Sequence, residues 1–364
     1  YRALKANTTG ANNTALGRNA LTANTTGANN IAVGYSALTA NTTASYNAAM
    51  GHNALSANTT GASNIAVGYL ALSANTTANN NTAVGVSALT ANTTGAANTA
   101  LGRNALTANT TANSNTAVGY FALSANTTGA SNVAVGYLAL DANTTASDNV
   151  AMGQSALSAN TTGQYNVALG FGAGYSTTTA TQLTTGDGNV FLGFRASGTV
   201  ATQDYGTAIG YTVAGAAGYT TVGQTTSDIR AAHGVATWAT VSDERYKKDI
   251  VDSTAGLAFV NALRPRTFKY RTLGELPETF RAYEAGSTEV FKNSDTNHGF
   301  IAQEVKVAID ADSSIKDGFR LWDDREDGSQ EVAEAALIPV LTRAIQELSA
   351  QVIALTARLA ILEG

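Results

Sequence analysis

A pattern of apolar and polar positions repeats every seventeen residues over the first half of the chain. The unit reads N-x-A-V-G-Y-x-A-L-x-A-N-T-T-G-A-x, with alanine always after N-x and only Leu, Val or Met next. The segment Tyr1 to Gly10 fits the end of the same unit, so we expect the chain to be a fragment that begins inside a further repeat. Its corner glycines keep the period without a slip: Gly17, Gly34, Gly51, Gly68, Gly85, Gly102, Gly119, Gly136, Gly153 and Gly170.

Alternation within an extended segment predicts one surface of large residues and one of small residues. Ile31 and Val33 point to one side of the strand, while Ala32 and Gly34 point to the other. Leucine fills a later apolar position in nine of the ten units, and A-N-T-T supplies a polar corner whose Asn and Thr can bond turn backbone. A lone unit cannot bury its apolar side, but coils stacked about 4.8 Å apart bury one continuous stripe.

The period predicts a mainly β protein built as a parallel β-roll or β-solenoid. Two short strands and two turns fit seventeen residues, whereas a helical hairpin needs about 33, and the glycine and Asn-Thr-Thr of every unit break helices. Over residues 1–175 the N-x-A-V-G and T-G-A-x-N-x-A-V-G patterns resemble the head repeats of trimeric autotransporter adhesins and the shafts of phage tail fibres. That resemblance implies a homotrimeric left-handed β-roll.

Beyond this region the period loosens and then ends. Related segments follow at 189–193, 207–210 and 221–223, at spacings of 23, 17 and 13 residues. We expect degenerate repeats or a neck over 176–229, and a connector over 230–241.

The C-terminal third has the composition of a different module. All three prolines, both tryptophans and most charged residues lie beyond residue 230. Ser253 as a cap predicts a helix through about Leu263, stopped by Arg264 and Pro265, and alternation over 267–271 predicts a strand.

The last segment, 336–364, has apolar residues at alternating spacings of three and four, which predicts a coiled coil. Ile or Val at the first core position with Leu at the second favours two strands in an isolated coil. Leu359 departs from that rule and a trimeric β-roll requires three strands, so we expect a trimer. The core positions are Ile338, Leu341, Ile345, Leu348, Val352, Leu355, Leu359 and Leu362.

Four sequence blocks in the C-terminal third resemble those of a second family, and they occur in the same order. They are SDERYKKDI from Ser242, GLAFVNALRPRTFKY from Gly256, HGFIAQEV from His298 and ALIPVLTRAIQEL from Ala336. Together they are similar to the C-terminal intramolecular chaperone of endosialidase-type phage tailspikes and tail fibres. The resemblance implies a small α+β module at 242–335 that trimerises, helps to fold the β-structured part before it, and then cuts itself off.

The same resemblance implies a serine and lysine dyad, which by position is Ser242 with Lys247. The cut would fall at Val241–Ser242, and the enzyme would be a single-turnover serine peptidase acting only on its own chain. His298, Gln303 and Glu304 are candidates for supporting roles.

A serine and lysine dyad requires a neutral lysine and a suitable distance between the two side chains. A lysine acts as a base only when neutral, so burial on folding and trimerisation must lower its pKa from about 10.4 toward 7 or 8. Lys247 is five residues from Ser242, which places it off the serine's face on a helix or a strand, so a dyad requires a bend. The alternative is that Ser242 is a helix N-cap, with Asp243 and Glu244 in the first turn.

Composition excludes several other classes of function. The chain has no cysteine, its three histidines are scattered, and no paired carboxylates suit a glycosidase, so we expect no metal site and no cofactor. With 21 basic and 26 acidic residues and no basic stripe, we expect no binding of nucleic acid. No run of about 18 apolar residues occurs, and we expect no membrane insertion.

These observations lead to one functional hypothesis and two alternatives. We expect a fragment of a phage tail fibre, made in the host cytoplasm and carried on the virion, that binds a glycan or protein receptor on the host surface. One alternative is a trimeric adhesin on a bacterial cell surface. Another is a rod that binds ice or glycans through its Thr-Thr ladder; the variable position of Tyr35 and Tyr69 could also meet glycans, although we expect those rings to stack along the rod.

A uniform repeat explains why such a rod would need a separate module that fixes the register of its chains, here called the clamp. Sliding one chain by seventeen residues against its partners leaves almost every contact intact, so the repeats specify register weakly. We expect the C-terminal module to set three chains in phase and to remove the entropic cost of the first coil.

Overall fold

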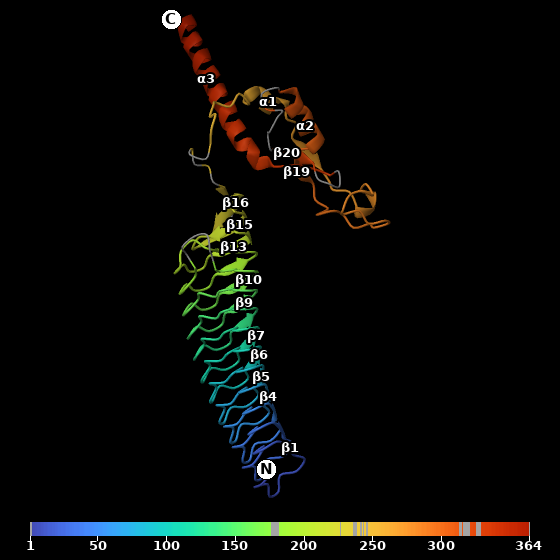
Figure 1. The fold of residues 1–364 in the computed structure, drawn as a ribbon. Helices are drawn as coiled ribbons and strands as arrows, with labels where there is room; N and C mark the ends of the chain where they lie inside the picture. The colour runs from blue at the N-terminus through green and yellow to red at the C-terminus, as the bar shows by residue number, and fades with distance from the viewer. Residues whose placement is uncertain are drawn as a thin grey trace. The chain divides into compact units, whose positions relative to one another are not determined.

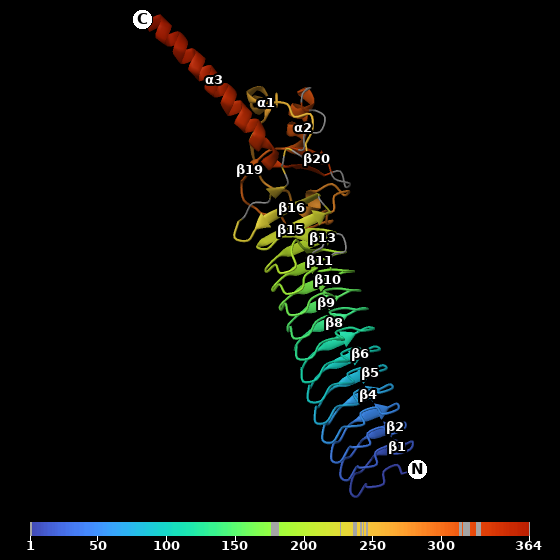
Figure 2. The same ribbon diagram turned by 60° about the vertical axis from the view of Figure 1, so that its left-hand side comes forward.

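One short strand per repeat stacks on the strand of the next repeat to build the N-terminal unit, Tyr1–Ser242 (Figures 1 and 2). The computed structural model describes residues 2–175, 182–225, 227–235, 239–240, 242, 244, 247–312, 315, 321–324 and 329–363. The strands of this unit are β1 (Thr14–Leu16), β2 (Ile31–Val33), β3 (Ala48–Met50), β4 (Ile65–Val67), β5 (Thr82–Val84), β6 (Thr99–Leu101), β7 (Thr116–Val118), β8 (Val133–Val135), β9 (Val150–Met152), β10 (Val167–Leu169), β11 (Val190–Leu192), β12 (Ser197–Gly198), β13 (Thr207–Tyr211), β14 (Ala214–Gly215), β15 (Tyr219–Gln224), β16 (Ser227–Ala232) and β17 (Ala239–Thr240).

The register of the main sheet follows the sequence period. From β1 to β9 each strand pairs in parallel with the strand seventeen residues on, as Ala32 does with Ala49. The parallel stack continues through β11, β13 and β15, and β16 and β17 then add antiparallel strands. Shorter β12 and β14 pair separately. The predicted mainly β solenoid is therefore confirmed.

The interior of each coil is lined by its smallest strand residue and by the leucine of the later position. Ala32 and Leu38 are fully buried, whereas Ile31 keeps 45% of its surface exposed. A coil of seventeen residues is thin, so a methyl group on one wall and a leucine on the other fill it. The larger strand side chains consequently point outward.

The expectation of two strands per coil is wrong for the coils of β1 to β10, where each coil has one strand and turns elsewhere, and it holds for the two coils that carry β11 with β12 and β13 with β14. The core leucines adopt left-handed backbone, with φ of 49° at Leu38 and 51° at Leu89, a conformation that costs roughly 1–2 kcal/mol per residue and interrupts any strand. Bonds between coils offset that cost, because the Leu38 amide donates to the Ala54 carbonyl at 3.1 Å.

Two ladders of fully buried asparagines tie the coils together. In one ladder Asn58 Nδ2 donates to Asn41 Oδ1 at 3.0 Å and to the Gly61 carbonyl at 2.8 Å. In the other, the Asn64 backbone amide donates to Asn47 Oδ1 at 2.9 Å. A buried polar group left unpaired costs about 1–3 kcal/mol, so each asparagine depends on the neighbouring coil. The prediction that this polar corner bonds turn backbone is confirmed.

The two asparagine ladders end differently at the C-terminal side of the repeats. In the first, the next coil carries fully buried Leu183 at this position, and Asn160 Oδ1 is buried without a hydrogen-bond partner in the described residues. In the second, Asn189 Oδ1 accepts from Gln203 Nε2 at 3.3 Å and from the Gly206 amide at 2.8 Å. The first ladder therefore ends at a leucine, and the second ends at bonds to Gln203 and Gly206.

One position of the repeat alternates between two residues, so the repetition there spans two coils. A Cβ built on Gly95 would lie 2.2 Å from the Ala112 carbonyl oxygen, which is shorter than any real contact of that kind. In this series a glycine precedes each alanine, a regularity that the seventeen-residue period did not predict. The alternating residues are Gly27, Ala44, Gly61, Ala78, Gly95, Ala112, Gly129, Ala146 and Gly163.

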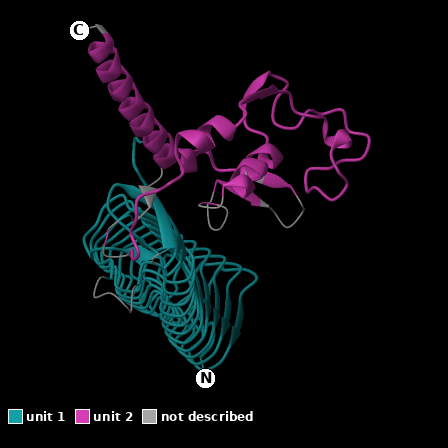
Figure 3. Cartoon of the chain, turned by 90° about the horizontal axis from the view of Figure 1, so that it is seen from above, with its two compact units in different colours: residues 1–242 teal, residues 243–364 magenta. Residues whose placement is uncertain are grey.

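The second unit, Asp243–Gly364, is a small α+β module (Figure 3). Its core includes Phe259, Val305, Ile309, Leu321 and Val340. Its elements are α1 (Leu257–Ala262), β18 (Arg266–Phe268), the 3-10 turn η2 (Leu273–Glu275), β19 (Asn297–Gly299), α2 (Ala302–Ala311), β20 (Trp322–Asp324), β21 (Gln330–Val332), the 3-10 turn η3 (Glu334–Ala336) and α3 (Leu337–Glu363). Antiparallel pairs form between β18 and β19 and between β20 and β21.

The expected cap of the first helix is wrong. Helix α1 begins at Leu257, and Ser253 Oγ instead accepts from the Ala255 amide at 3.3 Å. The free amide at the helix start is satisfied from another element, because Leu257 N donates to Glu347 Oε2 of α3 at 2.8 Å. The strand expected over 267–271 is also displaced, since β18 covers Arg266–Phe268.

Candidate functional site

Ser242 is the last residue of the first unit, and Lys247 lies five residues further along the chain. Both residues are exposed on the single chain. The Lys247 amide donates to the Glu244 carbonyl at 2.9 Å, which closes a turn between these two residues. Val241, on the other side of the expected cut, lies outside the described residues, as do residues 243, 245 and 246.

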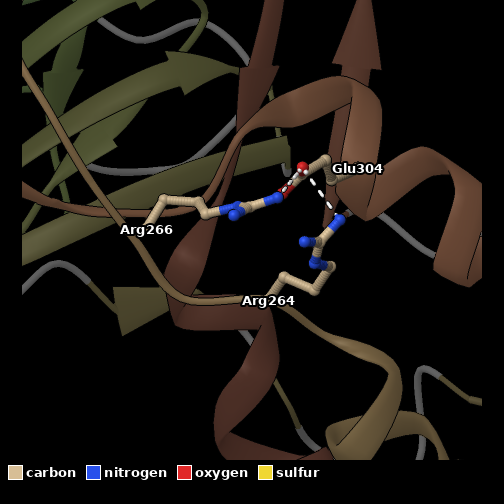
Figure 4. A network of polar contacts seen from close by, with 3 residues as sticks. All are labelled: Arg264, Arg266 and Glu304. Carbon is tan, nitrogen blue, oxygen red and sulfur yellow. Dashed lines mark hydrogen bonds and ion pairs between the residues drawn. The ribbon is translucent and has the colours of Figure 1, made fainter.

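Glu304 is the most strongly engaged of the expected supporting residues. It lies in the first turn of α2 and accepts from Arg266 Nε at 2.8 Å, from Arg266 Nη2 at 2.5 Å and from Arg264 Nη1 at 3.4 Å (Figure 4). The hydrogen bond from Arg266 holds the pKa of Glu304 below its usual range, so the group stays ionised. These contacts tie α2 to the start of β18, which is a structural role within the module.

His298 and Gln303 are also exposed. His298 lies in β19 opposite Thr267 of β18, and Gln303 lies in the first turn of α2. Their supporting roles stay predictions.

Helix α3 has a buried beginning and an exposed remainder. Val340 and Ala344 are buried, and Glu347 both pairs with Arg343 at 3.0 Å and caps α1. From Leu348 onward every α3 residue whose side chain is described is exposed. All eight expected core positions are exposed on the single chain, from 42% at Leu341 to 83% at Leu362. An apolar stripe of this length along one side of a helix is typical of a coiled-coil surface.

Residues 242–312 match the model of a protein family described as chaperone of endosialidase. The match begins at Ser242, the first residue after the expected cut. No curated protein and no solved structure matches the chain. The match supports a chaperone domain of this family in the C-terminal unit, and it agrees with the resemblance found in the sequence.

Length and composition of the helical segment Glu334–Leu362 would also suit a membrane span, with a mean hydropathy of 1.3 over its most apolar window. Two features favour association with other helices. Arg343 and Glu347 form an ion pair and Glu347 also accepts from the Leu257 amide of α1, and the apolar residues return at spacings of three and four along one side.

The outward surface of the N-terminal sheet is a second large apolar surface. Every strand from β1 to β11, and β13, places two uncharged side chains outward at its first and third residues. Examples are Ile31 at 45%, Met50 at 44%, Ile65 at 43% and Leu101 at 38% exposure. Contiguous apolar surface that runs the length of a sheet marks an interaction site. Sequence alternation predicted two surfaces but did not say which would be exposed.

Proposed function

We propose that three copies of this chain assemble through the chaperone domain and α3, that the repeats form the shaft of a phage tail fibre, and that the chaperone then cuts itself off at Val241–Ser242. The observation that carries the proposal is the family match that starts at Ser242, where the β-structured unit ends. The shaft would be carried on the virion and would reach a glycan or protein receptor on the host. A bacterial surface adhesin would use the same assembly.

Two exposed apolar surfaces support assembly from identical copies. The stripe of α3 supplies a coiled-coil core, and the outward surface of the strands carries no charge at any of its positions from β1 to β11. Another copy of the chain has the same strand spacing, so its apolar side chains meet this surface strand for strand. Burying such surface is favourable by about 25 cal/mol per Å².

The cleavage chemistry needs only groups of this chain and water. Lys247 would accept the proton of Ser242 Oγ as that oxygen attacks the Val241 carbonyl carbon, forming an ester while the peptide C–N bond breaks. The proton passes to the departing amine of residue 242, and water then hydrolyses the ester to a carboxylate at Val241. Because Lys247 is exposed on the single chain, its burial would have to come from assembly, which would make the cut follow trimer formation.

The Thr-Thr ladder gives less support to an ice-binding rod. The first threonine of each pair is engaged between coils, as Thr59 Oγ1 donates to the Thr76 carbonyl at 3.0 Å. Only the second threonine presents an exposed hydroxyl.

Ser242→Ala is expected to abolish cleavage completely, because alanine has no nucleophile. The intact mass of purified protein should give two fragments that meet at residue 242 for the original chain, and a single species of 37.1 kDa for the variant. Ser253→Ala is the matched control and should be cleaved normally, since Ser253 only accepts a bond from its own turn. A product ending at Val241 from the Ser242 variant would rule out this nucleophile.

A further inference from the structure

The residue after each corner glycine forms a ladder along the shaft, here called the aromatic ladder. Its rings stack from coil to coil, with centroids 4.9 Å apart for Tyr35 and His52, 5.6 Å for Tyr120 and Tyr137, and 5.0 Å for Phe194 and Tyr211. The stacking expected from the sequence is thus confirmed. The ladder consists of Arg18, Tyr35, His52, Tyr69, Val86, Arg103, Tyr120, Tyr137, Gln154, Phe171, Phe194 and Tyr211.

Arginines of the shaft lie close to these rings. Arg18 lies 5.8 Å from the centroid of Tyr35, Arg103 lies 5.6 Å from that of Tyr120, and Arg195, next to the ladder, lies 5.1 Å from that of Phe194. Among the described residues none of the three forms an ion pair. The shaft carboxylates Asp141, Asp148, Asp187 and Asp204 occupy other positions of the repeat.

This arrangement leaves the ladder exposed and positively charged. Arg18 and Arg103 are exposed, and Tyr35, Tyr69 and Tyr137 keep 43%, 50% and 48% of their surfaces open. Since the rings stack on one another, they present their edges, which carry the positive part of the ring quadrupole. An exposed guanidinium beside a ring, as at Arg18 and Arg103, can still bind an anion bidentately, whereas Arg195 Nε is buried without a hydrogen-bond partner among the described residues.

We infer that the aromatic ladder binds an acidic polysaccharide lying along the shaft. Five coils separate Arg18 from Arg103, or about 24 Å, so the ligand must be extended and must carry widely spaced anions. Double-stranded DNA carries a charge every 1.7 Å or so, and two or three arginines would neutralise too few of them. A sugar polymer carries carboxylates between hydroxyl-rich rings, and its oxygens suit both the guanidinium N–H groups and the positive ring edges.

The ladder is also poorly suited to face another copy of this chain. Burying arginines without carboxylate partners is costly, whereas the neighbouring outward strand positions are uncharged, with aliphatic residues, methionine or threonine. The outward surface of the strands therefore faces other copies of the chain, and the aromatic ladder faces solvent. This inference rests on the proposed attachment role, because it names a class of receptor for the shaft. Cleavage and assembly are measured by separate experiments, so absence of alginate binding would leave both of them standing.

The test is binding of the full chain to alginate, a polymer of uronic acids, measured by affinity electrophoresis with neutral dextran and a DNA duplex as comparisons. Alginate should retard the protein, and dextran and DNA should not. Arg103→Gln and Tyr120→Ala should each weaken alginate binding about tenfold, since each removes half of a charge-assisted contact.

Matched controls lie away from the ladder. Arg230→Gln removes an exposed arginine of β16 that lies 5.1 Å from the Tyr219 ring, and Tyr46→Ala removes a tyrosine that is 66% exposed. Both should bind alginate as the original chain does, and all four variants should keep its melting temperature. Three results would overturn the inference. They are retardation by dextran or DNA as strong as that by alginate, no retardation by alginate, and ladder variants that bind alginate as well as the control variants do.

Discussion

Leu348→Lys combined with Leu355→Lys is expected to leave the chain unassembled and its repeats unfolded. The two leucines are 50% and 62% exposed on the single chain and occupy consecutive second-core positions of the α3 stripe. In a trimer the double change would bury six ammonium groups beside one another, which costs far more than the helices gain by associating. Without the clamp, the first coils must form in three chains whose register is not fixed. Forming them costs loop-closure entropy, and no neighbouring coil is yet present to offset that cost.

Size-exclusion chromatography with far-ultraviolet circular dichroism measures both parts of this expectation. Ala350→Lys with Ala357→Lys is the control, because it adds the same charge to exposed residues on the opposite side of α3. The control should assemble and fold. A leucine variant that still elutes with the original size and keeps its β-sheet signal would show that α3 does not hold the copies together.

Gly102→Ala is expected to break the stack of coils at the sixth strand. Gly102 has φ of +140°, outside the range that an alanine adopts, and a Cβ there would lie 2.3 Å from the carbonyl oxygen of Gly119 in the next coil. The strain and the displaced backbone should cost about 3 kcal/mol or more in each chain. We expect a large fall in melting temperature and new proteolytic cleavage between coils near residue 102.

Ser114→Ala provides the comparison for this prediction. Ser114 is exposed, has φ of +61°, and occupies the position that already carries alanine at Ala97, with φ of +58°. A left-handed residue with open space around it should therefore tolerate the change within about 0.5 kcal/mol. Equal melting temperatures for Gly102→Ala and Ser114→Ala would mean that the corner glycines are not needed for close stacking.

Much of the shaft followed from the sequence because its period fixes the register. Seventeen-residue spacing places Ala32 opposite Ala49 and each buried asparagine beside the asparagine of the next coil, and the structure has these pairs. A period of this kind shows directly which residues are neighbours in successive coils. The fold class could therefore be predicted without knowing the path of the backbone within a coil.

The path within a coil was harder to predict because it depends on unusual backbone conformations. Leucine rarely adopts positive φ, yet Leu38 and its equivalents do so in each repeat, and strand propensity gave no sign of it. The cap of α1 was missed for a related reason. Glu347 is ninety residues from Leu257, and local sequence cannot show a cap supplied by a distant helix.

The candidate site was reached by motif rather than by physical pattern. Composition and spacing alone would leave Ser242 as an ordinary polar residue before a turn. Its role as nucleophile rests on the resemblance and stays a prediction, and the family match at 242–312 begins at this residue. Glu304 shows the limit of such transfer, since its contacts with Arg264 and Arg266 give it a structural role that the motif did not indicate.

Sedimentation equilibrium of the purified Ser242→Ala protein tests most directly whether three copies are joined at the C-terminal end. Keeping the chain uncut retains the clamp, and the solution mass then reports the number of copies. We expect three times 37.1 kDa, with the β-sheet signal of a folded shaft. A species of 37.1 kDa that carries the same β-sheet signal would contradict the assembly proposed here.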